Sequence, residues 1–364
     1  MVLRKSGENA IPLSLPSICF DLVGGTLVKG LKVLRGAPAS PRHRFSIVRS
    51  SARQSPPSDE SARTSHSTMS SHNGGFTNPT AILLQVDHTW NMGGIEVIRL
   101  LGAGAFGNVY EVDVAGSRVH RAMKVNSKRT SNPLSHITAL RSFLMQSSLQ
   151  HDHILPISFA IGDGVQLAII SPLATGGDLM MHLIQTGACS LADGVALSIG
   201  CSSALSYMHN LGYAHRDVKP DNFLLMTPGC AESVVLSDFD CAQWGVRQLD
   251  GLKTLVGTPV YWAPEIFAVR RATCEAYGYS ADVWSLGVTL YCVFCGVPPF
   301  DVLVSPSDTW SLSPFDESAL EWISLPLWLR NIIRRLIEDN PAERSSSAAV
   351  HGYFSSAHAA NNEH

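Results

Sequence analysis

The chain has 364 residues and 45% of them are hydrophobic, which is enough for a packed core in two modest domains or one large two-lobed domain. Its net charge of −3 is unevenly divided. Residues 1–80 carry ten Lys and Arg against four Asp and Glu, whereas the remaining residues carry 17 against 26. The acidic remainder argues against a nucleic-acid-binding domain, and no apolar run reaches the length of about 18 residues that a membrane-spanning helix requires.

The first 80 residues leave three interpretations open. Ile11–Phe20 is a short apolar segment after a basic start, as in a signal peptide, but it contains two prolines and is followed by Asp21. Residues 22–58 have no acidic residue and many Arg and Ser, which is typical of an organelle transit peptide. A disordered basic tail is the third interpretation. We therefore expect a cytoplasmic protein, or a secreted or organellar one if this segment is a targeting peptide.

Ordered structure is expected from about residue 90, where the pattern predicts three strands, Ile95–Leu101, Tyr110–Val114 and Val119–Val125. The glycine-rich stretch Gly102–Val109 joins the first two. In a dinucleotide-binding fold such glycines join a strand to a helix, whereas here a strand follows a strand. This order favours a hairpin whose backbone approaches phosphate groups.

The next segments predict a helix, a strand and a second helix. Residues 134–149 carry apolar side chains at helical spacing after a proline. Leu167–Ala174 is typical of a buried strand that runs into a loop. Leu191–His209 has few charges, which predicts a largely buried helix.

The eight cysteines are scattered without a repeated spacing, which favours a reduced environment over a disulfide framework. Cys292 and Cys295 form a Cys-x-x-Cys pair, but they belong to the apolar run that starts at Leu286. At helical spacing in such a run we expect them to be buried in the core rather than to bind a metal or act as a redox pair.

Three polar residues stand close together in the stretch Tyr213-Ala-His-Arg-Asp-Val-Lys-Pro-Asp-Asn222. The spacing of Asp217, Lys219 and Asn222 suits one short loop that directs three side chains to one point. A carboxylate can orient or accept a hydroxyl proton, an ammonium can neutralise a phosphoryl oxygen, and an amide oxygen can bind Mg²⁺. Asp238 follows Asp217 by 21 residues, so a β-hairpin between them would return it as a second metal ligand. This combination is what phosphoryl transfer needs.

This stretch, with Asp238-Phe-Asp240 and Gly257-Thr-Pro-Val-Tyr-Trp-Ala-Pro-Glu265 behind it, resembles the catalytic loop, metal-binding motif and activation-segment end of eukaryotic protein kinases, serine/threonine type. The glycine-rich hairpin and Lys124 resemble the phosphate-covering loop and the phosphate-orienting lysine of that family. The resemblance covers roughly residues 95–354.

The resemblance implies an α+β, bilobal protein kinase fold. A small β-rich N-lobe is expected at about residues 90–172 and a larger helical C-lobe at about 175–354, with 355–364 as a tail. The implied reaction transfers the γ-phosphate of Mg-ATP to a Ser or Thr hydroxyl of a protein, so ATP and Mg²⁺ are the expected cofactors and a protein substrate the expected partner, with no nucleic acid.

Roles for individual residues also follow from the resemblance. Asp217 and Lys219 are the expected catalytic residues, and Asn222 and Asp238 the expected Mg²⁺ ligands. The residues expected to contact the nucleotide are Gly102, Ala103, Gly104, Ala105, Phe106, Gly107, Val109, Ala122, Lys124, Ser171, Pro172, Ala174, Asp178, Asn222, Leu224 and Asp238. Asp178 is almost equally plausible as a solvated loop acid.

Regulatory and structural roles follow in the same way. Thr254 is the expected regulatory phosphorylation site, with Arg216 as its basic partner, and an unmodified loop threonine is the alternative. Asp282 would hold the backbone of the catalytic loop. Glu265 and Arg344 would form a structural ion pair.

Two positions depart from the family pattern. The family has a Glu in the helix before the hinge that pairs with the strand lysine, and here that position falls at or next to Ser142. The family also has Gly where this chain has Asp240, and Asp240 is the candidate replacement for the missing partner of Lys124. Two functions therefore stay open, an active serine/threonine kinase and a pseudokinase scaffold that binds nucleotide or partners without efficient phosphotransfer.

Overall fold

The structure is a computed structural model of the chain, and it describes residues 94–104, 107–126, 134–162, 167–304 and 310–362. It also contains two short antiparallel pairs near the N-terminus, β1 (Ser17–Cys19) with β4 (Lys32–Leu34) and β2 (Leu22–Val23) with β3 (Thr26–Leu27). The rest of residues 1–80, expected to be a tail or a targeting segment, lies outside the described residues. The chain divides into a strand unit, Met1–Arg129 with Ser158–Ile170, and a helical unit, Thr130–Ile157 with Ser171–His364.

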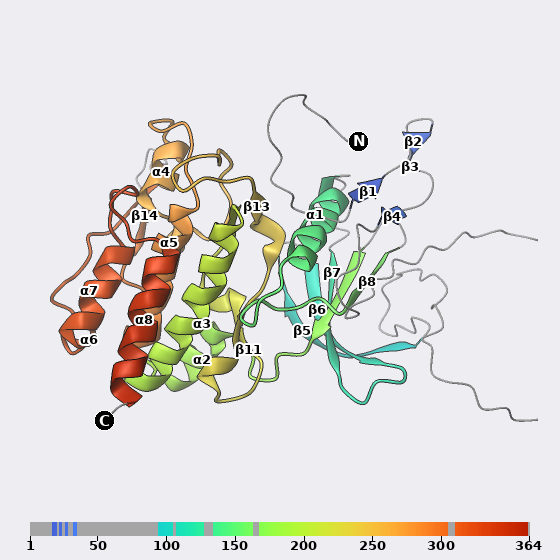
Figure 1. The fold of residues 1–364 in the computed structure, drawn as a ribbon, viewed down its shortest axis with the longest axis horizontal. Coiled ribbons are helices and arrows are strands. Elements are labelled where there is room, and N and C mark those ends of the chain that lie inside the picture. Colours follow the sequence, from blue (N-terminus) through green and yellow to red (C-terminus); the bar gives the residue numbers. More distant parts are fainter. Residues whose placement is uncertain are drawn as a thin grey trace, which may run out of the picture. The chain divides into compact units, whose positions relative to one another are not determined.

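The strand unit is built on a five-stranded sheet in the order β5-β6-β7-β9-β8 (Figure 1). Its strands are β5 (Ile95–Ala103), β6 (Gly107–Val114), β7 (Arg121–Asn126), β8 (Phe159–Gly162) and β9 (Leu167–Pro172). Side chains alternate between the faces of a strand, so one face of this sheet carries the apolar core, with Val112, Met123 and Ile170 fully buried. The three predicted strands are confirmed. The third begins two residues late because Ser117 closes a turn by donating to the Val119 carbonyl.

The helical unit contains most of the helices and several short strand pairs (Figure 1). Its helices are α1 (Leu134–Ser148), α2 (Leu179–Thr186), α3 (Leu191–Asn210), α4 (Pro264–Arg270), α5 (Ser280–Cys295), α6 (Leu320–Ile323), α7 (Leu327–Leu336) and α8 (Ser347–Asn362). The strand pairs are β10 (Tyr213–Ala214) with β13 (Gln243–Trp244), β11 (Phe223–Leu225) with β12 (Val234–Leu236), and β14 (Val302–Val304) with β15 (Trp310–Leu312). The predicted α+β architecture is therefore confirmed.

The core of the helical unit lies where α3 packs against α5 and α8. Every residue of α5 is buried, including Cys292 and Cys295, as the apolar pattern predicted. Two glycines let α3 approach its neighbours closely. A methyl group at Gly194 would lie 2.2 Å from the Phe294 ring, and one at Gly200 would lie 2.4 Å from a Val234 methyl.

The C-terminal helix continues farther than the sequence pattern suggested. We expected order to end near Phe354, but α8 runs to Asn362. The residues after Phe354 include several alanines and neither Gly nor Pro, so nothing in that stretch stops a helix. In the described part of the chain, none of the helices has the length and apolar character needed to cross a membrane.

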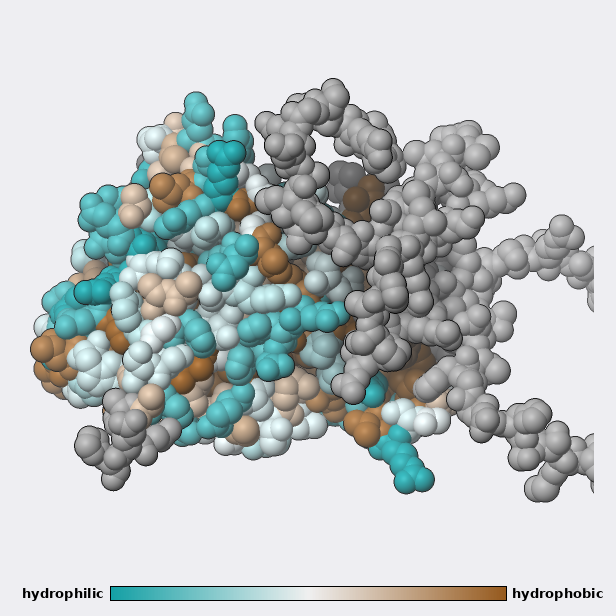
Figure 2. Space-filling view, viewed as in Figure 1, coloured by the Kyte–Doolittle hydropathy of each residue, from teal (hydrophilic) through white to brown (hydrophobic). Residues whose placement is uncertain are grey.

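The visible surface of the helical unit is mostly polar, with separate apolar patches (Figure 2). One patch lies at the left end of the view, over α6 and the start of α7. Leu320, Ile323 and Leu327 are all exposed there. Scattered exposed apolar side chains are usual on proteins, and these three do not define a site by themselves.

Candidate active site

The backbone of the loop between β10 and β11 is held by a buried carboxylate. Asp282, in the first turn of α5, accepts hydrogen bonds from the backbone N–H groups of His215 at 2.7 Å and Arg216 at 2.8 Å. Its other contact is the His209 imidazole, with 3.1 Å between Nε2 and Oδ2. Burial opposes ionisation of Asp282, but the hydrogen bonds and the nearby histidines outweigh it and lower the pKa of Asp282. These bonds sustain an uncommon backbone conformation at Arg216, with φ of 68°.

The predicted catalytic residues form one hydrogen-bonded group. Asp217 Oδ2 lies 3.0 Å from Lys219 Nζ, and Lys219 Nζ donates to Thr258 Oγ1 at 2.8 Å. Thr258 in turn donates to Asp217 Oδ1 at 2.9 Å. Asn222 Nδ2 donates to the Asp217 carbonyl at 2.7 Å and to its carboxylate at 3.1 Å. A carboxylate, an ammonium and a hydroxyl are thus held at one point, and all three residues are half-buried.

The hairpin of β11 and β12 returns the chain to Asn222, as its spacing predicted. The N–H and the hydroxyl of Ser237 both donate to the Asn222 carbonyl, at 2.8 and 2.9 Å. Asp238 follows in the left-handed region, with φ of 59°, and caps a short 3-10 helix, Phe239–Cys241, by accepting from the Asp240 N–H at 3.4 Å. Asn222 and Asp238 are therefore fixed side by side at the open end of the hairpin.

Residues 238–265, the expected activation segment, are held against the catalytic loop. Arg216 donates from Nε to the Cys241 carbonyl at 2.5 Å and from its guanidinium to Thr254 Oγ1 at 2.7 Å. The Tyr277 hydroxyl donates to the Thr254 carbonyl at 2.8 Å. Gly257, with φ of 90°, passes so close that a methyl group there would lie 2.3 Å from the Arg216 carbonyl oxygen. Only glycine fits this crossing.

Sequence reasoning missed Arg141. Ser142, the position assigned to the absent Glu, is buried within α1. The residue before it, Arg141, donates to the Ala242 carbonyl at 2.8 Å and also to the side-chain oxygen of Gln243. Burial lowers the pKa of Arg141, and the positive charge of Arg216 nearby lowers it further. The available signal was a basic residue in a helix otherwise without charge, but no motif contains it.

Glu265 and Arg344 form an ion pair within the helical unit. Arg344 is buried and donates to both carboxylate oxygens of Glu265, at 2.7 and 3.0 Å. It also donates to backbone carbonyls, among them Ser280 at 2.9 Å, and its guanidinium lies 5.3 Å from the centre of the Trp284 ring. This arrangement ties α4 to the start of α5.

Several of the expected nucleotide residues lie on the sheet of the strand unit. Val109 is directly opposite Lys124 in the β6–β7 register, and Ala122 is two residues from Lys124, so the three share one face. The hairpin between β5 and β6 starts with Gly102, Ala103 and Gly104 and resumes at Gly107. Ala105 and Phe106 lie outside the described residues.

The remaining expected nucleotide residues belong to the helical unit. Ser171 is buried at the end of β9, and Pro172 and Ala174 are half-buried after it. Asp178 has a structural task, because its carboxylate caps α2 by accepting from the Met181 N–H at 2.8 Å. Asp178 also forms a backbone bridge with Leu224 of β11.

Comparison with known proteins agrees with this geometry. A family model described as the protein kinase domain matches residues 95–354. The human calcium/calmodulin-dependent protein kinase type 1B is 30% identical over 270 residues, which are 72% of this chain and 75% of that protein. The CBL-interacting protein kinase 4 of Oryza sativa subsp. japonica is 32% identical over 272 residues, 72% of this chain and 58% of that protein. The calcium-dependent protein kinase 3 of Plasmodium berghei is 29% identical over 263 residues, 70% of this chain and 45% of that protein.

Proposed function

Because the chain belongs to the eukaryotic protein kinase family, serine/threonine type, we propose that it is a catalytically competent kinase that transfers the γ-phosphate of Mg-ATP to a Ser or Thr hydroxyl of a protein. The observation that carries this proposal is the group of Asp217, Lys219, Thr258 and Asn222, joined by bonds of 2.7 to 3.1 Å. A chain kept only as a scaffold has no physical need for this arrangement.

Each member of the group has a chemical task. Asp217 orients the acceptor hydroxyl and takes its proton, because a carboxylate is the one base in the group. Lys219 faces the same point and neutralises charge on the transferred phosphoryl oxygens. Thr258 accepts from Lys219 and donates to Asp217, so it holds the segment around it, which is expected to bind the acceptor, close to both residues.

The donor set beside this group fits Mg²⁺. Asp238 and Asn222 offer a carboxylate and an amide oxygen, and Mg²⁺ prefers hard oxygen ligands and takes the rest from phosphates and water. In the described residues no group of three or more His, Cys, Asp and Glu side chains is arranged to hold a metal alone, which suits an ion shared with a nucleotide. When bound, the ion would draw charge from the phosphate oxygens.

The nucleotide residues follow from the same proposal. Lys124 binds the phosphates that are not transferred, under a lid formed by Gly102 to Gly107, including Ala103, Gly104, Ala105 and Phe106. The adenine contacts are Val109, Ala122, Ser171, Pro172, Ala174 and Leu224, and Asp178 keeps one oxygen for the ribose while the other caps α2.

Asp240 takes the place of the absent helix Glu in orienting Lys124. Support comes from one missing and one additional carboxylate in the sequence. The Asp240→Gly variant, which restores the family residue, should bind Mg-ADP about tenfold more weakly by calorimetry. Unchanged or tighter binding would contradict this role.

Thr254 is the regulatory site. It is exposed, and its hydroxyl already accepts from Arg216 at 2.7 Å. A phosphate there would meet this guanidinium group and form charge-assisted hydrogen bonds. Mass spectrometry after incubation with Mg-ATP should find phosphate on Thr254, and the Thr254→Val variant should lose activation.

The partner is a protein with a Ser or Thr acceptor, and the compartment is the cytoplasm unless the N-terminal segment directs the chain elsewhere. Nothing in the acidic composition of residues 81–364 supports a nucleic-acid partner.

One comparison tests the central proposal. Wild type should transfer labelled phosphate to a generic protein substrate, and the Asp217→Asn variant should be slower by a factor of about 10³ because the general base is lost. Asp250→Asn, which neutralises an exposed acid of the same segment, is the matched control and should keep full activity. Equal background with wild type and Asp217→Asn would overturn the proposal and leave the scaffold function.

A further inference from the structure

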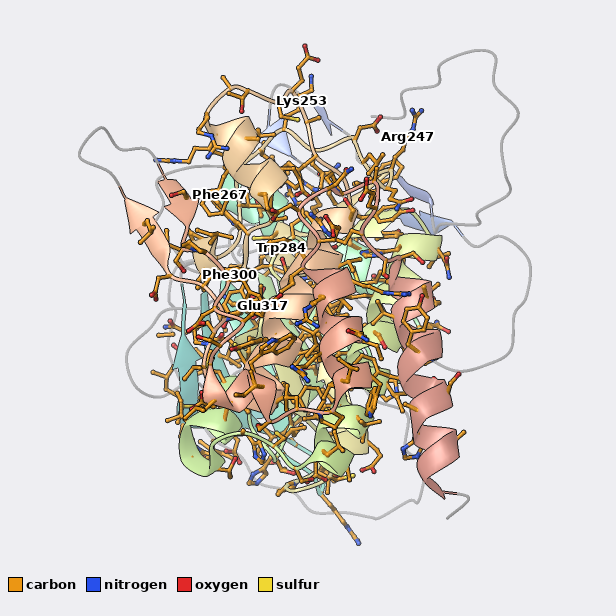
Figure 3. The ribbon with its side chains drawn as sticks, turned by 90° about the vertical axis from the view of Figure 1, so that its left-hand side faces the viewer. Arg247, Lys253, Phe267, Trp284, Phe300 and Glu317 are labelled. Carbon is orange, nitrogen blue, oxygen red and sulfur yellow. The ribbon has the colours of Figure 1, made fainter. Side chains whose placement is uncertain are left out.

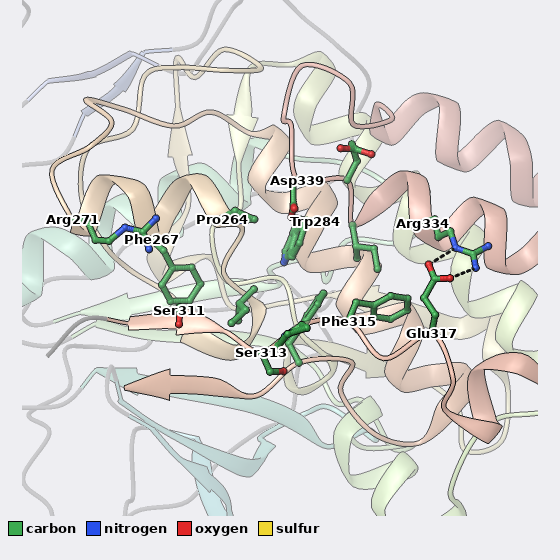
Figure 4. A pocket seen from close by; sticks show the side chains of 15 residues that line it. Pro264, Phe267, Arg271, Trp284, Ser311, Ser313, Phe315, Glu317, Arg334 and Asp339 are labelled. Atoms are coloured by element: carbon green, nitrogen blue, oxygen red, sulfur yellow. Dashed lines mark hydrogen bonds and ion pairs between the residues drawn. The ribbon is translucent and has the colours of Figure 1, made fainter. Parts of the chain in front are cut away.

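A pocket of about 560 Å³ lies in the helical unit, away from the catalytic loop (Figure 4). Its walls come from α4, α5, the segment of residues 311–317 and the end of α7. The volume falls in the range of ligand sites, about 300–1,000 Å³, and exceeds what one side chain fills. Neither the proposed reaction nor the nucleotide uses any of these residues.

The inner wall of the pocket is aromatic. The Trp284 and Phe300 rings stack at 5.4 Å and 14°, and Phe315 lies 5.9 Å from Phe300. Figure 3 shows Phe267, Trp284 and Phe300 one below the other on the same side of the helical unit. Aromatic walls of this kind accept another ring in stacked or edge-to-face contact.

A buried donor at this wall lacks a partner. Trp284 is 2% exposed, and its indole N–H meets no acceptor in the described part of the chain. In Figure 4 the Trp284 nitrogen is turned toward the middle of the lining side chains. A buried N–H without an acceptor is unfavourable, so a ligand acceptor that reaches it strengthens binding in addition to the apolar contacts.

The rim of the pocket has an excess of negative charge. Arg334 binds Glu317 through two bonds of 3.1 Å, so these two charges cancel. Glu338 and Asp339 also line the pocket, and neither belongs to an ion pair among the described residues. Arg271 also lines the pocket, so its five charged side chains leave one net negative charge. A cation on the ligand would meet Glu338 and Asp339 on this rim.

The pocket wall also connects to the acceptor-binding segment. Phe267 packs edge-on against Trp262 at 5.5 Å, and the Trp262 indole donates to the Val256 carbonyl at 2.9 Å. Val256 lies between Thr254 and Thr258 in the sequence. A ligand that contacts Phe267 would therefore be linked, through Trp262 and Val256, to the segment that contains both threonines.

We propose that this pocket is a docking site for a protein partner, which inserts a Phe or Tyr side chain followed directly by Lys or Arg. The partner's ring packs against the aromatic side chains of the pocket, and its cation lies beside Glu338 and Asp339. A backbone carbonyl of the partner accepts the hydrogen bond from the Trp284 indole. The chemistry favours a peptide over a lipid, because a lipid tail offers no acceptor for the buried N–H and no cation for the rim.

Three fluorescein-labelled capped tetrapeptides test this occupant by anisotropy with the full-length protein. Gly-Phe-Arg-Gly should bind, Gly-Phe-Glu-Gly should bind about tenfold more weakly, and Gly-Ala-Arg-Gly should not bind measurably. The double variant Glu338→Gln/Asp339→Asn should bind the first peptide about fivefold more weakly, whereas the matched control Glu343→Gln, an exposed acid outside the pocket, should leave its affinity unchanged. Equal binding of the three peptides, or no effect of the double variant, would overturn the proposal.

A second measurement locates the binding. The Trp284 indole ¹H–¹⁵N signal, one of seven from the seven Trp residues, should move downfield on addition of Gly-Phe-Arg-Gly. Its assignment comes from Trp284→Phe or, if that variant does not fold, from Phe267→Leu, which alters the same wall. A stationary Trp284 signal at saturating peptide contradicts the site. Asp217→Asn should bind the peptides as wild type does, so a failure of the proposed kinase activity would leave this test intact.

Discussion

The catalytic loop and helix α1 both contact the start of the activation segment, and both do so through an arginine. Arg216 of the loop holds the Cys241 carbonyl, and Arg141 of α1 holds the next carbonyl, that of Ala242. Behind Arg216 stands a buried carboxylate, Asp282, with three hydrogen-bond partners. Arg141 has no such carboxylate on its own helix, because α1 contains no acidic residue.

This difference shows how position is secured in the two regions. The catalytic loop is held by several hydrogen bonds, so the loss of one leaves others that maintain the same backbone conformation. Helix α1 contacts the segment after Asp238 through Arg141 and buries Met145 in the core, but the family's acid is absent from it. We therefore expect the loop to keep its geometry under perturbation and α1 to shift more readily.

The largest effect should come from breaking the loop support. Asp282→Asn removes a buried charge and turns an amide donor toward one of the two backbone N–H groups, so the free energy of unfolding should fall by about 3 kcal/mol. Urea unfolding measures this. Asp250→Asn, an exposed acid, is the control and should change stability by less than about 0.5 kcal/mol. A loss below about 1 kcal/mol for Asp282→Asn would show that the loop is held by other bonds.

The same carboxylate predicts a pH dependence. Its pKa is lower in the folded state than in the unfolded chain, so its contribution is present above the ordinary Asp pKa of about 3.9 and is lost as pH falls through the lower folded value. The stability difference between wild type and Asp282→Asn should therefore stay constant from neutral pH to about pH 5 and narrow below about pH 4. A difference that narrows near neutral pH would contradict this assignment.

A smaller effect is expected at the other arginine. Arg141→Met keeps the length of the side chain and removes both bonds to the segment, so stability should fall by about 1–2 kcal/mol. Hydrogen exchange of the amides of Ala242 to Trp244 should accelerate, while that of Val218 in the loop should not change. Arg141→Lys keeps one donor group and the charge, so its stability and its exchange rates should lie between those of wild type and Arg141→Met. Equal acceleration in both regions would abolish the distinction between them.

The smallest effect is chemical and needs no change in overall stability. Burial raises the pKa of Cys241 to about 11, with help from Asp217 and Asp238, so its thiol should resist alkylation at pH 7. Exposed Cys274 supplies the fast internal reference. The Arg141→Met variant should alkylate Cys241 several-fold faster, because opening of α1 is the route of access. An Arg216→Lys variant with the same increase would show that the loop, too, opens locally.

The catalytic loop was the most predictable part of the molecule. Asp217, Lys219 and Asn222 lie within six residues of one another, so a short loop necessarily brings them together. The length of the hairpin that follows indicated that Asp238 would return beside them. Four of the five strands of the sheet were also predicted, but β8, which has only four residues, was not. The ion pair of Glu265 and Arg344 is formed by residues far apart in sequence, and only the family resemblance pointed to it.

Other features had no local signal. The contact of Arg141 with Ala242 joins residues about a hundred positions apart, and neither belongs to a motif. Asp178 looked like a ribose ligand or a solvated acid, but capping depends on where α2 begins, which composition does not specify to the residue. The pocket at Trp284 is formed by segments that no pattern connects.

The glycines of α3 have a consequence for how the helical unit folds. Each glycine inside a helix lowers its intrinsic stability by about 1 kcal/mol relative to alanine, and α3 contains two of them because Phe294 and Val234 occupy the space a side chain would need. The helix is thus weak alone and strong only when its neighbours are in place. A fragment ending after α3 should be largely unstructured, and α3, α5 and β12 should appear together in a single cooperative refolding step.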